Sequence, residues 1–132
     1  MIGVDTNVLV RLFVDDDHRQ HKLAVRFFDE RSADDAVFIS VVTVVEFFWV
    51  MKRTYKRKPA AILDLLTGML ESEDAIFEKA DEIRQVIALA RQTGADLADL
   101  LIARSGQMAG CRTSVTFDQP AAKLASGMEL LK

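Results

Sequence analysis

The sequence predicts an α/β fold: a three-layer sandwich in which helices cover both faces of a mainly parallel central sheet of four or five strands. Short runs rich in β-branched and aromatic residues alternate with longer segments of helical periodicity, which is the pattern of strands joined by helices. Of 132 residues, 50% are hydrophobic and only two are proline. This composition fits a single domain over residues 1–132 and excludes a collagen, a coiled coil or a largely disordered chain.

Local patterns place the elements of the first part of the chain. The apolar run at 2–4 predicts a strand, and Asp5, Thr6 and Asn7 are typical of the turn that begins a helix. Thr43 and Glu46 have capping-box spacing, so Thr43 is expected to cap its helix. The expected elements are a strand at 2–4, a helix at 8–14, a helix around 23–28, a strand at 37–40, a helix from Thr43 to about Tyr55 and a helix from about Pro59 to 70.

The second part continues the alternation. Asp96 stands where a helix cap belongs, and Gly94 and Gly110 stand where helices end. Thr113 to Phe117 has the composition of a buried strand. The expected elements are a brief strand at 76–78, a helix around 83–90, a helix from Leu97 to Met108, a strand at 113–117, a short helix from Asp118 to about Ala125 and an edge strand at 130–131.

Composition also limits partners and compartment. Seventeen basic against twenty acidic residues give a net charge of −3, so no global positive field indicates a nucleic-acid partner. No window reaches the roughly 20 apolar residues of a membrane span, and no secretory signal is recognisable. Cys111 is the only cysteine, which excludes an intrachain disulfide and favours a reducing, cytoplasmic location. We expect its side chain to pack in the core.

Four acidic residues are expected at one edge of the sheet. Asp5 and Asp118 directly follow strands, and Glu46 and Asp99 lie in the first turns of helices that follow strands or turns. Carboxylates about 4 Å apart repel by roughly 4 kcal/mol per pair at an effective dielectric near 20, so protons, basic groups or cations must neutralise them. An all-oxygen set suits Mg²⁺ or Mn²⁺, and such an ion at a phosphate favours phosphodiester hydrolysis.

Each carboxylate also has a structural interpretation. Glu46 completes a capping box, Asp96 and Asp99 suit a helix start, and Asp118 suits a turn before Pro120. Only the joint placement of the acids favours a metal site.

Four segments carry a resemblance to a known family. They are Met1–Leu9 with Asp-Thr-Asn, Ile39–Glu46 ending in glutamate, Gly94–Ala103 with Ala98-Asp99-Leu100, and Gly110-Cys111 followed by Thr116-Phe117-Asp118. In this order and spacing the whole chain resembles the PIN-domain ribonucleases, most closely the VapC-like toxins of toxin–antitoxin pairs. Leu100 departs from the pattern, in which alanine is common, and this affects local packing only.

The resemblance implies a metal-dependent endoribonuclease that hydrolyses RNA phosphodiesters and is neutralised by a cognate antitoxin. It implies that Mg²⁺ or Mn²⁺ is held by Asp5, Glu46, Asp99 and Asp118, with Asp96 as a further candidate ligand. Thr6, Asn7 and Thr116 would orient these carboxylates by hydrogen bonds. A homodimer is also implied.

Three further groups have two interpretations each: a basic group (Lys52, Arg53, Lys56, Arg57 and Lys58), an apolar group (Phe47, Phe48, Trp49 and Met51) and two histidines (His18 and His21). The basic group suits either a solvated helix end or a contact with RNA or an acidic antitoxin segment. The apolar group is partly core, and the resemblance implies a homodimer contact or an antitoxin groove for the rest. The histidines, at helical spacing beside three aspartates, suit either a metal site or a solvated loop, and we expect the loop, without chemistry.

Other functions remain open from the residues. A phosphotransfer receiver or a haloacid-dehalogenase-like phosphatase also gathers aspartates around magnesium, but the latter needs a second aspartate where this chain has Asn7. A receiver also needs an aspartate closing a middle strand and a lysine after a late one. A non-catalytic PIN scaffold that binds RNA or protein would be favoured if one of the four acids were missing, and all four are present.

Overall fold

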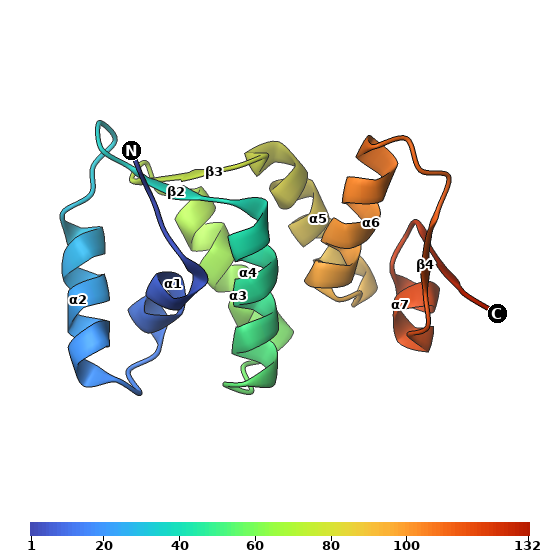
Figure 1. The fold of residues 1–132 in the computed structure, drawn as a ribbon, viewed down its shortest axis with the longest axis horizontal. Helices are drawn as coiled ribbons and strands as arrows, with labels where there is room; N and C mark the ends of the chain where they lie inside the picture. The colour runs from blue at the N-terminus through green and yellow to red at the C-terminus, as the bar shows by residue number, and fades with distance from the viewer. The chain divides into compact units, whose positions relative to one another are not determined.

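The chain folds into two units, each with a small parallel sheet, in a computed structural model that describes residues 1–132 (Figure 1). The first unit is Met1–Ala80 and the second is Asp81–Lys132. The elements of the first are β1 (Ile2–Gly3), α1 (Thr6–Phe13), α2 (His18–Asp29), β2 (Val37–Ile39), α3 (Val41–Arg53), α4 (Pro59–Leu70) and β3 (Ala75–Phe77). Those that follow are α5 (Ala80–Thr93), α6 (Leu97–Met108), β4 (Ser114–Thr116), α7 (Gln119–Leu124) and β5 (Met128–Leu130).

The sheet of the first unit has the strand order β1-β2-β3. Both pairings are parallel, with Ile2 opposite Val37 and Val37 opposite Ala75. The central strand β2 is the best buried, because Val37 and Ile39 have no exposed surface. Helix α1 packs against α2 and α3, and α3 packs against α4, which also contacts β3. The two edge strands of this sheet are therefore β1 and β3.

The sheet of the second unit has two strands. Strands β4 and β5 pair in parallel, with Ser114 opposite Met128, and α7 connects them and packs on both. The predicted alternation of helices with parallel strands is thus confirmed. Because three strands lie in one sheet and two in the other, a single sheet of four or five strands stays a prediction.

Two strands are more exposed than predicted. The expectation of a buried strand at 113–117 is wrong, since Val115 is 58% exposed and Phe117 is 80% exposed. Ile2 in β1 is 41% exposed. Each of these strands has a partner on one side only, and alternate side chains of such a strand point away from its own unit's core.

Helix α3 begins earlier than the sequence indicated. Ser40 caps it, and the Ser40 hydroxyl accepts a hydrogen bond of 3.1 Å from the backbone N–H of Thr43. The predicted capping box is therefore wrong: Thr43 is the third helical residue and Glu46 lies in the second turn. Ser40 and Thr43 are both good caps, and the helix uses the one that directly follows β2.

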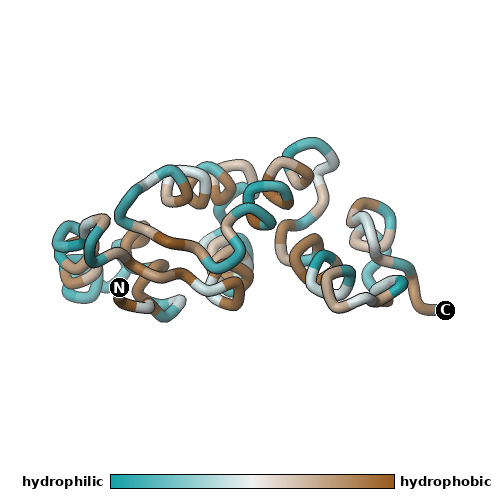
Figure 2. Tube along the Cα trace, turned by 90° about the horizontal axis from the view of Figure 1, so that it is seen from above, coloured by the Kyte–Doolittle hydropathy of each residue, from teal (hydrophilic) through white to brown (hydrophobic).

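Hydrophobic and hydrophilic residues alternate along the helices, and brown and teal stretches mark them in Figure 2. In α3 the side chains of Phe47, Phe48 and Met51 are at most 1% exposed, so these belong to the core. Trp49 is different, being 51% exposed. None of the helices is both long and apolar enough to cross a membrane.

Two predictions about single residues are wrong. Cys111 is exposed rather than packed in the core, because β4 begins only at Ser114 and the cysteine lies in the preceding loop. His18 and His21 lie in α2 rather than in a loop. The ring Nδ1 of His21 donates to the carbonyl oxygen of Arg11 at 2.7 Å, which is a structural bond between α1 and α2.

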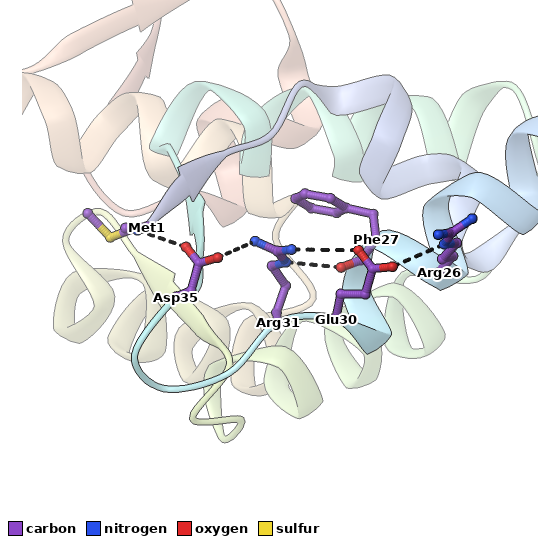
Figure 3. A network of polar contacts seen from close by, with 6 residues as sticks. All are labelled: Met1, Arg26, Phe27, Glu30, Arg31 and Asp35. Atoms are coloured by element: carbon purple, nitrogen blue, oxygen red, sulfur yellow. Dashed lines mark hydrogen bonds and ion pairs between the residues drawn. The ribbon is translucent and has the colours of Figure 1, made fainter.

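A network of charged groups joins the end of α2 to the start of β1 (Figure 3). The guanidinium of Arg31 donates to Asp35 at 2.8 Å and to the carbonyl of Phe27 at 3.0 Å, and it lies 4.5 Å from the centre of the Phe27 ring. The terminal ammonium of Met1 donates to Asp35 at 3.1 Å. This hydrogen bond, with the attraction of Arg31, lowers the pKa of the Asp35 carboxyl below its ordinary value.

Asp35→Asn should lower stability at neutral pH and have little effect in acid. A carboxyl whose pKa is lower in the folded chain stabilises the fold above its unfolded pKa of about 3.9, and this contribution is lost as pH falls through the folded value. Urea unfolding of native chain and variant should show a difference that narrows below about pH 4. Asp34→Asn, at the exposed neighbour, is the control; a difference independent of pH would contradict the account.

Candidate active site

Asp5 lies just beyond β1 and caps helix α1. Its Oδ1 accepts a hydrogen bond of 2.7 Å from the backbone N–H of Thr6, and the carboxylate is exposed to solvent. The sequence dictates this position, because an apolar strand gives way to an aspartate that suits a cap. The helix start also presents a partial positive charge to this carboxylate.

Glu46 is brought to the same place by α3. Its Oε2 accepts a hydrogen bond of 3.1 Å from the Thr6 hydroxyl, and its carboxylate is also exposed. Thr6 itself is only 5% exposed, and its backbone N–H and its hydroxyl each donate to a carboxylate, which fixes its side chain. One buried threonine therefore contacts both Asp5 and Glu46, the two candidate ligands in the first unit.

The donor set of this pair fits a hard divalent ion. The hydrogen bonds from Thr6 use Oδ1 of Asp5 and Oε2 of Glu46, so each carboxylate keeps a second oxygen free of protein hydrogen bonds. Mg²⁺ is commonly held by one or two carboxylates and completes its shell with water and substrate phosphates. Neither unit alone gathers three His, Cys, Asp or Glu side chains that could hold a metal ion. By itself the pair is therefore not a complete metal site.

The other candidate ligands lie in the second unit at helix starts. Asp96 caps α6, as predicted, and accepts a hydrogen bond of 3.2 Å from the backbone N–H of Asp99. Asp118 caps α7 and accepts one of 2.9 Å from Ala121. The carboxylates of Asp96 and Asp118 thus have structural roles as caps, and capping leaves the other oxygen of Asp118 without a hydrogen bond.

Thr116 and Asn7, two of the three residues expected to orient carboxylates, make no hydrogen bond to a candidate carboxylate. The Thr116 hydroxyl accepts a hydrogen bond of 3.0 Å from the backbone N–H of Asp118, so it fixes the backbone at Asp118 and not the carboxylate. Asn7 is exposed and makes no hydrogen bond to Asp5 or Glu46. Asn7 lies instead with Asp5 on a groove of about 450 Å³ that β1, α1 and α2 form, with Val8, Leu23 and Phe27 among its apolar lining.

The predicted basic group lies at and beyond the end of α3. Arg53, Lys56, Arg57 and Lys58 are exposed, and none of these four forms an ion pair. The guanidinium of Arg53 lies 5.3 Å from the centre of the Trp49 ring. Trp49 was not among the predicted site residues. Its spacing of three residues from Glu46 and four from Arg53 places the three on one helix face, and the sequence already contained this signal.

Thr6→Val should weaken Mn²⁺ binding about 10- to 100-fold, because it removes the hydroxyl that holds Glu46 while keeping the side-chain shape. Isothermal titration calorimetry measures the affinity. Thr43→Val is a matched control, since Thr43 is also a buried threonine, 6% exposed, and its hydroxyl bonds with Ser40 instead of an acid. Equal affinity losses in the two variants would exclude a special role for Thr6.

Comparison with protein families gives one match: the model of the PIN domain matches residues 2–126. A search of curated proteins found no match. PIN domains are generally nucleases that act on RNA and use divalent metal ions, which agrees with the acidic pair that Thr6 holds. With nearly its whole length covered by that match, the chain belongs to the PIN domain family.

Proposed function

We propose that the chain is a Mg²⁺- or Mn²⁺-dependent endoribonuclease and the toxin of a toxin–antitoxin pair, active in the cytoplasm. The observation that carries the nuclease proposal is the sharing of Thr6 by Asp5 and Glu46. Two exposed carboxylates fixed by one buried residue form a negative site with free oxygens, and a divalent cation is the simplest partner for it. Membership of a nuclease family supplies the reaction class.

The full ligand set in this proposal is Asp5, Glu46, Asp99 and Asp118, with Asp96 close to Asp99 in sequence. Asp5 and Asp118 each come just after a parallel strand, β1 and β4. Ligands of parallel α/β sheets bind outside the carboxyl ends of the strands, which supports a ligand role for both residues.

The residues of the chain have defined tasks in the proposed hydrolysis. A bound divalent ion supplies hydroxide near neutral pH and stabilises charge on phosphorus and on the leaving oxygen. Asp5 and Glu46 hold that ion, and Thr6 keeps both carboxylates in place through its backbone N–H and its hydroxyl. Because water rather than the ribose 2′-hydroxyl attacks, the products carry a 5′-phosphate and a free 3′-hydroxyl.

The proposal includes a protein partner for the groove of β1, α1 and α2. This groove is largely apolar, and Leu23 on it is 56% exposed, as an antitoxin segment with apolar side chains would require. A homodimer is part of the same proposal.

The reaction is tested by incubating the purified chain with total cellular RNA, in Mg²⁺, in Mn²⁺ and in chelator, and sequencing the cut ends. We expect cleavage with either ion, none in chelator, and 5′-phosphate ends. Fragments with 2′,3′-cyclic phosphates would contradict the mechanism. Binding of RNA with no cleavage under any of these conditions would favour a non-catalytic scaffold.

Asp5→Asn should reduce cleavage by more than about 100-fold, because a ligand is lost rather than a residue that only orients one. The fold should be retained, since asparagine caps a helix as well as aspartate does. Cleavage of a labelled RNA and the midpoint of thermal unfolding give the two readouts. Asp34→Asn, which removes an exposed carboxylate elsewhere in the first unit, is the control. Undiminished cleavage by Asp5→Asn would remove Asp5 from the mechanism.

A further inference from the structure

One face of α3 carries a row of exposed side chains that includes Glu46. Val42, Glu46, Trp49 and Arg53 are spaced by four, three and four residues, so they follow one another on the same side of the helix. The core residues Phe47, Phe48 and Met51 occupy the other side. Trp49 comes one turn after Glu46, about 4.5 Å further along the helix axis. An aromatic ring is therefore adjacent to the acidic pair.

The exposure of Trp49 is not explained by packing. It is the only tryptophan of the chain, and it leaves 51% of its surface exposed while the two preceding phenylalanines are buried. The guanidinium of Arg53 lies 5.3 Å from its ring centre, within the range of a cation–π interaction. That contact orders both side chains on the helix surface. The pair, here called the platform, presents an aromatic ring with a guanidinium over it on the helix surface.

A positively charged turn continues from this platform. Lys56, Arg57 and Lys58 are exposed and, like Arg53, form no ion pair, although the chain has twenty acidic residues. The turn is fixed by backbone hydrogen bonds, with the N–H of Arg57 donating to Met51 at 3.0 Å. Lys56 has φ of 55°, a left-handed conformation that glycine adopts more easily. A lysine at that position supplies charge at a cost in backbone strain.

We propose that Trp49 and Arg53 form a stacking site for a base of single-stranded RNA, with the phosphates of the same strand lying along Lys56, Arg57 and Lys58. The identity of the ligand as RNA rests on the proposed function. Aromatic rings and arginine planes stack on unpaired bases, and basic side chains track the backbone. A base inside a duplex has both faces covered, so the site selects single-stranded segments for the adjacent acidic pair.

The charges on this surface disfavour a second copy of the chain as the occupant. In a two-fold symmetric contact the same patch meets itself, which would bring two sets of unpaired cations together. A polyanion meets the same patch with opposite charge. The observations therefore favour RNA, and self-association through Trp49 becomes an outcome that the experiment can detect.

The unique tryptophan makes the proposal directly measurable. The full chain is titrated in chelator with an oligouridylate of about ten nucleotides, and tryptophan emission and the anisotropy of a labelled RNA are recorded together. We expect the emission to be quenched as RNA binds. An abasic oligomer of equal length should bind more weakly and leave the emission unchanged, as should a duplex. Unchanged emission at saturating oligouridylate would overturn the proposal.

Variants separate stacking from general apolar contact. Trp49→Leu should weaken oligouridylate binding roughly 5- to 150-fold, the range expected for loss of one stacked base. Trp49→Phe should restore most of the affinity. Ile76→Ala, at an apolar side chain 46% exposed in β3, is the control and should bind as the native chain does. Native affinity in Trp49→Leu would overturn the proposal.

Two closely matched variants test the proposed contact between the basic turn and the RNA phosphates. Lys56 and Lys79 are both exposed lysines with left-handed backbones, with φ of 55° and 52°. Replacing either by glycine removes one charge and relieves similar strain, so neither variant should unfold. Only Lys56→Gly should reduce the slope of log affinity against log salt, by about 0.7. Equal slopes in the two variants would overturn the placement of the phosphates.

These outcomes are distinct from those that test the nuclease proposal. Quenching without any cleavage would overturn the proposed reaction and support the stacking site. Metal-dependent cleavage together with native RNA affinity in Trp49→Leu would overturn the stacking site alone. Emission that changes on dilution of the protein without RNA would identify a self-association surface at Trp49 and overturn the proposal.

Discussion

The two hydrogen bonds that Thr6 donates are the constraint on which the proposed site depends. One runs from its backbone to Asp5 and the other from its hydroxyl to Glu46, and together they tie the start of α1 to the second turn of α3. Because Thr6 is buried, it cannot move without disturbing the packing of α1. Two carboxylates of like charge are thereby tied to the same residue.

Helix α3 connects this site to the rest of the first unit. Its buried face holds Phe47, Phe48 and Met51 in the core, so the opposite face has a fixed orientation and presents Glu46, Trp49 and Arg53 outward. The packing of the buried face therefore fixes which side chains of α3 are exposed to solvent. The proposed stacking of RNA and the proposed hydrolysis use neighbouring turns of one rigid helix.

The helix starts and the strands could largely be predicted from sequence, because they depend on local residue preferences. Asp5 and Asp118 cap helices just after strands, Asp96 caps one just after Gly94 and Ala95, and all five strands occur close to their expected places. Choices between equivalent local signals were not predictable: Ser40 and Thr43 both suit a cap, and only the end of β2 decides between them. Long-range pairing decided the rest. The exposure of Val115 and of Cys111 depends on which strand pairs with β4 and where β4 begins, and local sequence does not carry this information.

The central proposal is that Asp5, Glu46, Asp99 and Asp118 are ligands of one ion. The most direct measurement is the amide spectrum of ¹⁵N-labelled chain during titration with substoichiometric Mn²⁺, a paramagnetic ion that broadens the signals of nearby residues. We predict that amides next to all four acids lose intensity together, and that Asp5→Asn removes the effect in both units. Broadening confined to Met1–Ala80, with the amides around Asp99 and Asp118 unaffected, would contradict the shared site.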